Sequence, residues 1–266
     1  MFVKNCIVSD DFLEQLQNLQ PWSHYFKFDD VTYTGYIEDV FNETGRTFCC
    51  RSDSPQMIER FRRMYEDTFV NSRRFLMPIE LLKTIAGNQF ATSSVLDLSC
   101  NDGLKAIACK LAGAGYVNGV EIRRDCVERG KFISGLMGVD VAFNHVSASA
   151  DSPEYGAVIE PADYVLSLGI LYHLVDHEQY LKTLRTLTKK CMIMFTSHGG
   201  PQSRESDEKR EIPYRSFTGK AKLPARNEVT SMLYKAGFEH VLEWNYNPSV
   251  APTDFTESCL YLVAYP

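Results

Sequence analysis

The feature that most constrains the fold is a pair of apolar runs joined by a helical segment, in residues 95–121. The first run ends in a loop of small and polar residues at 99–103 (SCNDG), and the second ends in a carboxylate, Glu121. Apolar runs that alternate with helical segments are typical of a parallel sheet covered by helices. The pattern therefore predicts a strand–loop–helix–strand unit, which opens many nucleotide-binding α/β sheets.

The loop itself has the properties of a ligand-binding turn. Short side chains at Ser99, Cys100 and Gly103 allow a ligand to approach the backbone closely. The helix that follows directs its N-terminal N–H groups toward the same place. Glu121 stands where a carboxylate can accept both hydroxyls of a ribose. We therefore expect a nucleoside ligand with a free 2′-hydroxyl, and the alternative is a unit of the same topology with no ligand.

The loop residues argue against a dinucleotide. The dinucleotide fingerprint has glycines where the pyrophosphate meets the backbone, and Ser99 and Asn101 occupy two of those positions. Two acids, Asp97 and Asp102, flank the loop and would repel a pyrophosphate. They suit a ligand with a cationic end. S-adenosylmethionine carries a sulfonium and an ammonium group and has no phosphate.

In these residues the chain resembles the class I S-adenosylmethionine-dependent methyltransferases. The first motif of that superfamily is rich in glycine (D-x-G-C-G-x-G), and residues 97–103 (DLSCNDG) form a polar variant of it. The resemblance implies a Rossmann-like α/β fold, with a mostly parallel sheet and an antiparallel strand near the C-terminus. It also implies S-adenosylmethionine as the cofactor and S-adenosylhomocysteine as its product.

Three segments together resemble one branch of the superfamily, the family of the bacterial tRNA wobble-uridine carboxymethyltransferase. They are residues 95–103, residues 168–174 (LGILYHL) and residues 223–238 (LPARNEVTSMLYKAGF). That family carries C-N-x-G, G-x-L-Y-H and P-N…M-L…A-G-F in the same order. The chain lacks the Lys-Gly-Pro stretch with which the tRNA enzyme holds a carboxylated cofactor. Methyl transfer from plain S-adenosylmethionine is therefore expected.

The cofactor-binding residues follow partly from the resemblance, which places the methionine end at the loop, the ribose at Glu121 and the sulfonium side at Leu168 and Tyr172. From the residues themselves, Ile122 is expected to cover one face of adenine. The turn at 147–153 is expected to pass the adenine edge. The full set is Asp97, Ser99, Cys100, Asn101, Gly103, Glu121, Ile122, Ala148, Ser149, Leu168 and Gly169.

The candidate catalytic residues follow the predicted fourth strand. Methyl transfer depends on holding the acceptor in line with the methyl group, and a base is needed only if the acceptor must lose a proton. His173 and Tyr172 are the candidates by location, and His198 is third. The alternative for His173 is structural packing behind the cofactor. A metal pair with His177 is not expected, because Asp176 should cap a helix that begins after His173.

The chain is expected to divide into an N-terminal α+β extension or substrate cap (1–75) and a cofactor-binding domain (76–266), in which the polar segment 201–225 is a lid. The extension should contain a helix from Asp10, two aromatic strands at 21–28 and 31–36, and a helix over 56–70. Its aromatic residues either pack a core or wall a pocket over the cofactor.

Charge and composition bear on partners. The net charge of −6 disfavours a wide nucleic-acid footprint. Arginines at 60, 62, 63, 73 and 74 form either a solvated helix face or a surface for RNA or an anionic substrate. No apolar run is long enough to span a membrane, and residues 1–6 lack a signal-peptide core. The eight cysteines are scattered, which indicates free thiols and a cytoplasmic location.

Four functions remain open from the sequence. The first is methyl transfer to a small molecule. The second is RNA modification, favoured by the tRNA branch and the arginine segments. The third is a non-catalytic cofactor-binding protein, suggested by the missing loop glycines at 99 and 101. The fourth is another nucleoside-binding enzyme. The sequence indicates neither the acceptor atom nor an oligomeric state.

Overall fold

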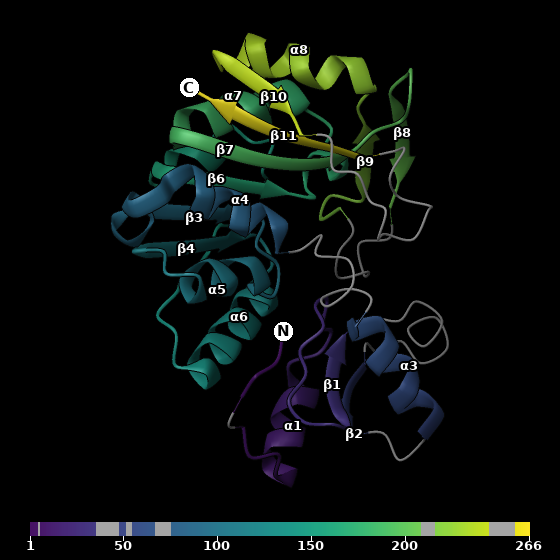
Figure 1. Ribbon diagram of the computed structural model, residues 1–266. Coiled ribbons are helices and arrows are strands. Elements are labelled where there is room, and N and C mark those ends of the chain that lie inside the picture. The colour runs from purple at the N-terminus through teal and green to yellow at the C-terminus, as the bar shows by residue number, and fades with distance from the viewer. Residues whose placement is uncertain (5, 36–47, 52–54, 67–75, 209–215, 245–258) are drawn as a thin grey trace.

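A seven-stranded sheet forms the centre of the computed structural model, which describes residues 1–4, 6–35, 48–51, 55–66, 76–208, 216–244 and 259–266. The strand order is β10-β11-β7-β6-β3-β4-β5 (Figure 1). In chain order the strands are β3 (Ser94–Leu98), β4 (Tyr116–Glu121), β5 (Ala142–His145), β6 (Ala162–Leu168), β7 (Thr188–Ser197), β10 (His240–Glu243) and β11 (Cys259–Tyr265). Strands β3 to β7 are parallel, and β11 runs antiparallel to both β7 and β10. The predicted fold is confirmed.

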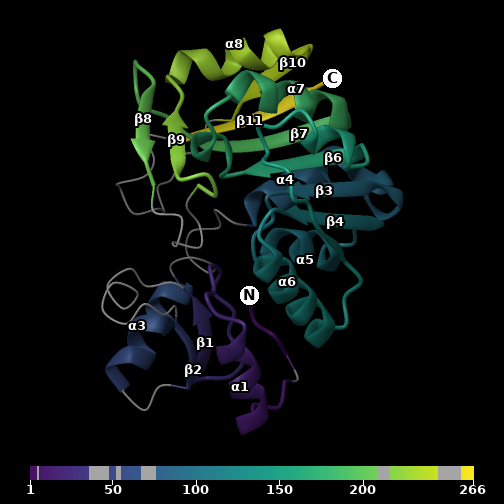
Figure 2. The ribbon, with the colours of Figure 1, turned by 180° about the vertical axis from the view of Figure 1, so that it is seen from behind.

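Helices cover both faces of the sheet (Figures 1 and 2). On one face lie α4 (Met77–Ala86), α5 (Leu104–Leu111) and α6 (Arg124–Met137), and on the other lie α7 (His177–Leu187) and α8 (Arg226–Ala236). Successive strand residues point to opposite faces. Val95 accordingly packs in the core under α4 to α6, and Leu96 packs in the core under α7 and α8. Two cores therefore hold the sheet in place.

This domain also contains short 3-10 helices, and two of its α-helices begin or end at the residues predicted. The 3-10 helices are η2 (Gly87–Thr92), η3 (Tyr155–Ala157) and η4 (Leu171–His173). Asp176 caps α7 by accepting from the N–H of Gln179 at 2.9 Å, as predicted. Gly237 ends α8 with a φ of 101°, which favours glycine. Among the described residues, no helix is long and apolar enough to cross a membrane.

The N-terminal region contains α1 (Asp10–Asn18), β1 (Thr32–Gly35), β2 (Phe48–Arg51) and α3 (Pro55–Tyr65), with β1 antiparallel to β2. The helix predicted from Asp10 is confirmed, and Ser9 caps it by accepting from the N–H of Phe12. The predicted strand over 21–28 is wrong, because this stretch forms only isolated bridges at Lys27. The N–H groups of Ser23 and His24 bond a carboxylate instead of a neighbouring strand, so no ladder can form there.

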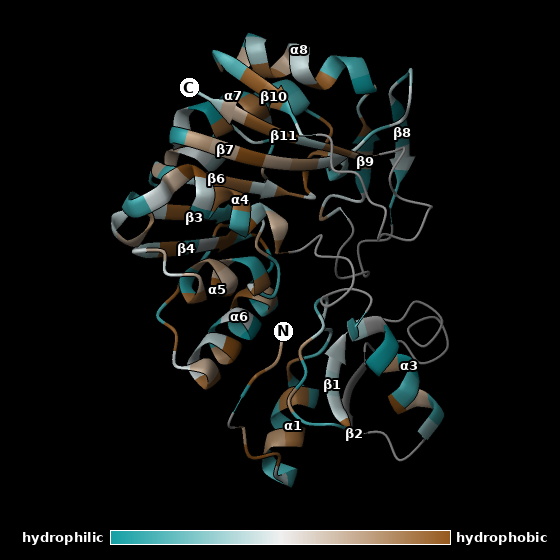
Figure 3. Cartoon of the chain, in the orientation of Figure 1, coloured by the Kyte–Doolittle hydropathy of each residue, from teal (hydrophilic) through white to brown (hydrophobic). Residues whose placement is uncertain are grey.

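The extension packs against the sheet domain through aromatic residues. The Phe12 ring of α1 stacks on Phe132 of α6 with ring centres 6.0 Å apart, and meets Phe28 edge-on at 5.3 Å. Buried Trp22 and Phe26 belong to the same core as Val95. Figure 3 shows apolar residues along the central strands and on α1. Core packing therefore accounts for these aromatic side chains.

The segment predicted as a lid carries secondary structure of its own. Strands β8 (Arg204–Asp207) and β9 (Lys220–Leu223) pair antiparallel, and β9 contacts η4. This contact brings β9 beside the 3-10 helix that carries Tyr172 and His173. The role of this segment as a lid stays a prediction.

Candidate functional site

The loop between β3 and α5 adopts a left-handed backbone at three alternate residues. The φ angles of Ser99, Asn101 and Gly103 are 57°, 51° and 78°. This region favours glycine, so the two polar residues keep the conformation of the glycines that they replace. Gly103 has a second constraint, because a Cβ there would lie 2.5 Å from the ring of Phe143. The polar variant of the motif thus preserves the loop geometry.

Glu121 is buried and held by backbone donors. The N–H of Asn101 donates to Oε2 at 3.0 Å, while Ile122 and Arg123 donate to Oε1 at 2.9 and 3.0 Å. Burial raises the pKa of Glu121, and these donors oppose that effect. A carboxylate has about four acceptor positions. One position on Oε2 therefore remains for a ribose hydroxyl, and the expected contact with both hydroxyls stays a prediction.

Two adjoining cavities meet at this loop. Both are lined by Ser99, Asn101, Gly169 and His173. The first cavity is also lined by Glu121, Ile122, Arg123, Ser149, Ala150, Tyr155, Ile170, Leu174 and residues 216–218. The second is also lined by Ser23, His24, Pro78, Lys105, Leu168, Tyr172, Phe195 and Tyr261. The structure thus brings nine of the predicted site residues together: Ser99, Asn101, Glu121, Ile122, Ser149, Leu168, Gly169, Tyr172 and His173.

Four predicted cofactor-binding residues do not line these cavities. Asp97 is 1% exposed; burial raises its pKa to about 6, and its Oδ2 has no hydrogen-bond partner. Cys100 is buried with its N–H bonded to Val120, and Gly103 precedes α5. Ala148 lines a different cavity, beside Asn118 of β4. Asp97, Cys100 and Gly103 still lie within or next to the loop, and Ala148 directly precedes Ser149, which lines the first cavity.

His173 forms a pair with a carboxylate that sequence reasoning missed. Its Nδ1 lies 2.8 Å from Oε2 of Glu208, which also accepts from the N–H of Ser216 at 2.6 Å. The ring of Tyr172 lies 4.2 Å from that of His173. His198, the third candidate, lines neither cavity, and its Nδ1 accepts from the N–H of Gly200. Glu208 lies in the segment 201–225, where a charged residue gives no signal of its own.

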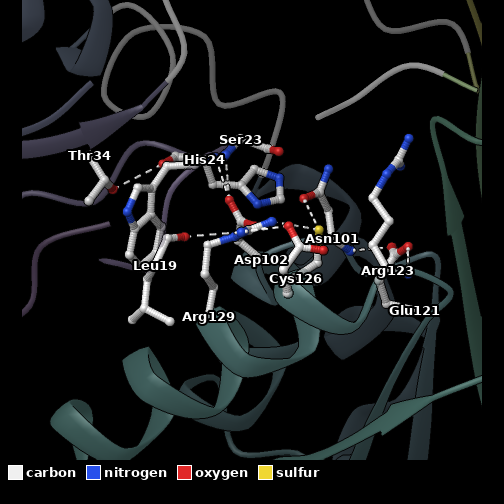
Figure 4. Close-up of polar contacts among 12 residues, drawn as sticks. Leu19, Ser23, His24, Thr34, Asn101, Asp102, Glu121, Arg123, Cys126 and Arg129 are labelled. Atoms are coloured by element: carbon white, nitrogen blue, oxygen red, sulfur yellow. Dashed lines mark hydrogen bonds and ion pairs between the residues drawn. The ribbon is translucent and has the colours of Figure 1, made fainter. Parts of the chain in front are cut away.

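The carboxylate of Asp102 bonds other residues of the chain (Figure 4). It is completely buried, and it accepts from Nε of Arg129 at 2.6 Å and from the N–H groups of Ser23 and His24 at 2.6 and 3.0 Å. The prediction that its charge faces the cationic end of a ligand is therefore wrong. Its carboxylate joins the cofactor loop to α6 and to the N-terminal extension. The bonds to Ser23 and His24 bring both residues to the second cavity.

The structure also describes some of the arginines and cysteines that the sequence singled out. Arg62 pairs with Glu59 and with Glu66, which directly follows α3, and Arg63 pairs with Glu59; all four side chains are exposed. Arginines 73 and 74 lie outside the described residues. Six cysteines with described side chains are free thiols. In the described part of the chain, no group of three His, Cys, Asp or Glu residues could hold a metal ion.

Comparisons with known proteins bear on the same residues. A family model described as a methyltransferase domain matches residues 70–243. No curated protein sequence matches the chain. Among solved structures, the N-terminal domain of EvdMO1 with S-adenosylhomocysteine bound is 16% identical, has a TM-score of 0.67, and the match covers 98% of each chain.

Two further structures are similar. The same EvdMO1 domain in the presence of S-adenosylhomocysteine and D-fucose is 17% identical, with a TM-score of 0.61 over 96% of this chain and 95% of that one. Magnesium protoporphyrin IX methyltransferase (ChlM) from Synechocystis PCC 6803 with bound S-adenosylmethionine is 17% identical, with a TM-score of 0.52 over 85% and 93%. At these identities the likeness shows a shared fold.

Proposed function

We propose that this chain, which belongs to the methyltransferase domain family and is an S-adenosylmethionine-dependent methyltransferase, methylates a small molecule. The small molecule would bind in the second cavity. The observation that carries this proposal is that the second cavity is lined from three regions of the chain. The aromatic side chains of Tyr172, Phe195 and Tyr261 line it, as do Ser23 and His24 of the extension. A pocket walled in this way suits a compact acceptor rather than a polymer.

The first cavity is the proposed place of the adenosine half of the cofactor. The free acceptor position of Glu121 would take one ribose hydroxyl, and Ile122 would cover the adenine. The sulfonium would then lie where the two cavities meet, at Gly169. A side chain at Gly169 would approach Oη of Tyr172 to 3.4 Å, and its φ of 92° favours glycine. The backbone therefore leaves room for an acceptor next to the methyl group.

His173 is the proposed base. An ionised Glu208 can only accept a hydrogen bond, so Nδ1 of His173 carries the proton and Nε2 is the bare nitrogen. His173 would accept the proton of an acceptor hydroxyl at Nε2 while that hydroxyl is methylated. A bound cofactor would supply the electrophilic methyl group and would keep the electron pair of the bond that breaks. The partner carboxylate would hold the ring in place during this step.

Methylation or carboxymethylation of tRNA is the second candidate, and it rests on the resemblance to the wobble-uridine branch. The pairing of Arg62 and Arg63 with acids on α3 removes two of the cations that favoured it. Transfer of a labelled methyl group separates the candidates. We expect label in the low-mass fraction of a cell extract and none in total tRNA. Label in tRNA, with binding that weakens steeply as salt rises, would favour the RNA candidate.

Calorimetry tests the cofactor site directly. The protein should bind S-adenosylhomocysteine and not NAD, and Glu121→Ala should weaken binding by about 1–3 kcal/mol, the scale of hydrogen bonds to a charged group. Glu128→Ala is the matched control, because that exposed glutamate bonds only Lys131 among the described residues. Equal affinity in the wild type and Glu121→Ala would remove Glu121 from the site.

A further inference from the structure

Two residues of the N-terminal extension that line the second cavity each carry a buried polar atom without a hydrogen-bond partner. Ser23 and His24 line this cavity, and the Oγ of Ser23 and the Nδ1 of His24 have no hydrogen-bond partner. His24 as a whole is only 9% exposed. Buried polar atoms are costly to leave unpaired, and native proteins rarely leave them so. Two such atoms in neighbouring residues of one cavity wall therefore indicate a place for the polar groups of a ligand.

The backbone around these two residues is fixed. Their N–H groups both donate to Oδ2 of Asp102, and Thr34 Oγ1 donates to the carbonyl of His24 at 3.1 Å. Asp102 is fixed in turn by Arg129 of α6. With the backbone groups engaged, the side chains are the parts of Ser23 and His24 that remain for a ligand. A rigid support of this kind positions binding groups accurately.

The surroundings of His24 indicate which chemistry it can recognise. Burial lowers the pKa of His24 well below its usual value, and the positive charges of Lys105 and Arg129 lower it further. A neutral imidazole has one donor and one acceptor nitrogen. A hydroxyl group can satisfy either nitrogen, and Ser23 Oγ can bond a second hydroxyl. The rings of Tyr172 and Tyr261 line the same cavity and offer flat apolar surfaces that suit a ring.

We propose that Ser23 and His24 form the acceptor-binding subsite of this methyltransferase, and that it takes a ring compound carrying neighbouring hydroxyl groups. The hydroxyls bond the Ser23 Oγ and the His24 Nδ1, and the ring lies toward Tyr172. This inference rests on the proposed small-molecule function and assigns the recognition step to the extension. A sugar and a phenol share this chemistry.

Binding to the full-length protein saturated with S-adenosylhomocysteine tests the subsite. Two probes separate the sources of the chemistry: D-fucose, a sugar, and catechol, a phenol. Nitrogen NMR of ¹⁵N-histidine-labelled protein reports on His24, whose signals are identified by their loss in His24→Gln. We expect at least one probe to shift the His24 ring nitrogens in a saturable way. A shift with D-fucose alone indicates a sugar acceptor, and one with catechol alone indicates a phenol.

The variants sharpen the test. Ser23→Ala and His24→Gln should each raise the dissociation constant of the probe about tenfold, which is the effect of one lost hydrogen bond in a desolvated site. Their affinity for S-adenosylhomocysteine should stay that of the wild type, which also confirms that they are folded. Ser231→Ala and His240→Gln change exposed residues and are the matched controls.

Two outcomes would overturn the subsite. One is that neither probe moves the His24 signals, and the other is that Ser23→Ala and His24→Gln bind the probe as tightly as their controls. Failure of the wild type to bind S-adenosylhomocysteine is a separate result, because it contradicts the cofactor site and not the subsite. The two failures are therefore distinguishable in the same set of titrations.

Discussion

Asp102 and Arg129 form an ion pair in which both residues are completely buried, with Nε of Arg129 2.6 Å from Oδ1 of Asp102. The guanidinium also donates to Asp125 and to the carbonyl of Leu19. The pair therefore joins the cofactor loop, α6 and the N-terminal extension. Removing one member of such a pair leaves a buried charge with too few partners.

Arg129→Met should lower the free energy of unfolding by about 3–5 kcal/mol, as expected for breaking a buried ion pair. Urea unfolding measures the change. Lys131→Met is the control on the same helix, because the bond of Lys131 to Glu128 is exposed and worth at most about 1 kcal/mol. Equal losses in the two variants would mean that the buried pair contributes no more than a surface contact.

A second prediction concerns pH and Asp97. Burial raises the pKa of Asp97 to about 6. Between about pH 4 and pH 6 the folded protein therefore binds more protons at this residue than the unfolded chain, so its stability falls as pH rises. At about 1.4 kcal/mol for each pKa unit, the whole loss is roughly 3 kcal/mol. Asp97→Asn should remove this part of the pH dependence in urea unfolding without cofactor.

The comparison is of slopes rather than of absolute stabilities. Burial also raises the pKa of Glu121, and that contribution has the same sign and remains in Asp97→Asn. The variant should therefore keep a shallower fall between pH 4 and pH 6. Parallel curves for the wild type and the variant would contradict the assignment of the titration to Asp97.

The third prediction concerns His173 and its partner. His173→Gln should lower the single-turnover rate of methyl transfer to the low-mass fraction of a cell extract about a hundredfold, which is within the range for losing a general base. Glu208→Gln should lower it less, because that residue acts through the position of the His173 ring. Affinity for S-adenosylhomocysteine should be unchanged in both. A lower melting temperature with a normal rate in the folded fraction would show that His173 is structural.

The sheet and the cofactor were predictable because their signals are local. Val95 and Val117 lie in short apolar runs, and Glu121 directly follows one of them, so one window of sequence contains the whole unit. The conformation of Ser99 and Asn101 was not predictable from their types, since glycine is the residue that favours it. The resemblance to a glycine-rich motif indicated the ligand loop but did not predict this conformation.

The acceptor side was largely hidden for a different reason. Asp102 is 79 residues from Ser23 in the chain, and Glu208 is 35 residues from His173. Contacts across such distances are set by tertiary packing and leave no period or motif in the sequence. The extension was expected to pack a core or to wall a pocket. The aromatic Trp22 packs the core, as one of the two alternatives had it, whereas the cavity is lined by the adjacent Ser23, which was not among the residues considered.

The last prediction concerns two glycines in different conformations. Gly103 has a φ of 78°, and a Cβ there would lie 2.5 Å from the ring of Phe143. Gly135 is exposed within α6, and a Cβ there would have no atom within 4 Å. Gly103→Ala should therefore lower the free energy of unfolding by more than about 1 kcal/mol, whereas Gly135→Ala should raise it by roughly 0.5–1 kcal/mol.

Cofactor binding separates the two glycines further. The backbone of Gly103 shapes the loop that also holds Asn101 against Glu121, so Gly103→Ala should weaken S-adenosylhomocysteine binding in calorimetry. Gly135→Ala should leave that affinity unchanged, because the residue lies in α6 outside both cavities. If Gly103→Ala bound the product as tightly as Gly135→Ala, the left-handed conformation at this position would not be required for the cofactor site. The close contact with Phe143 would then matter for stability alone.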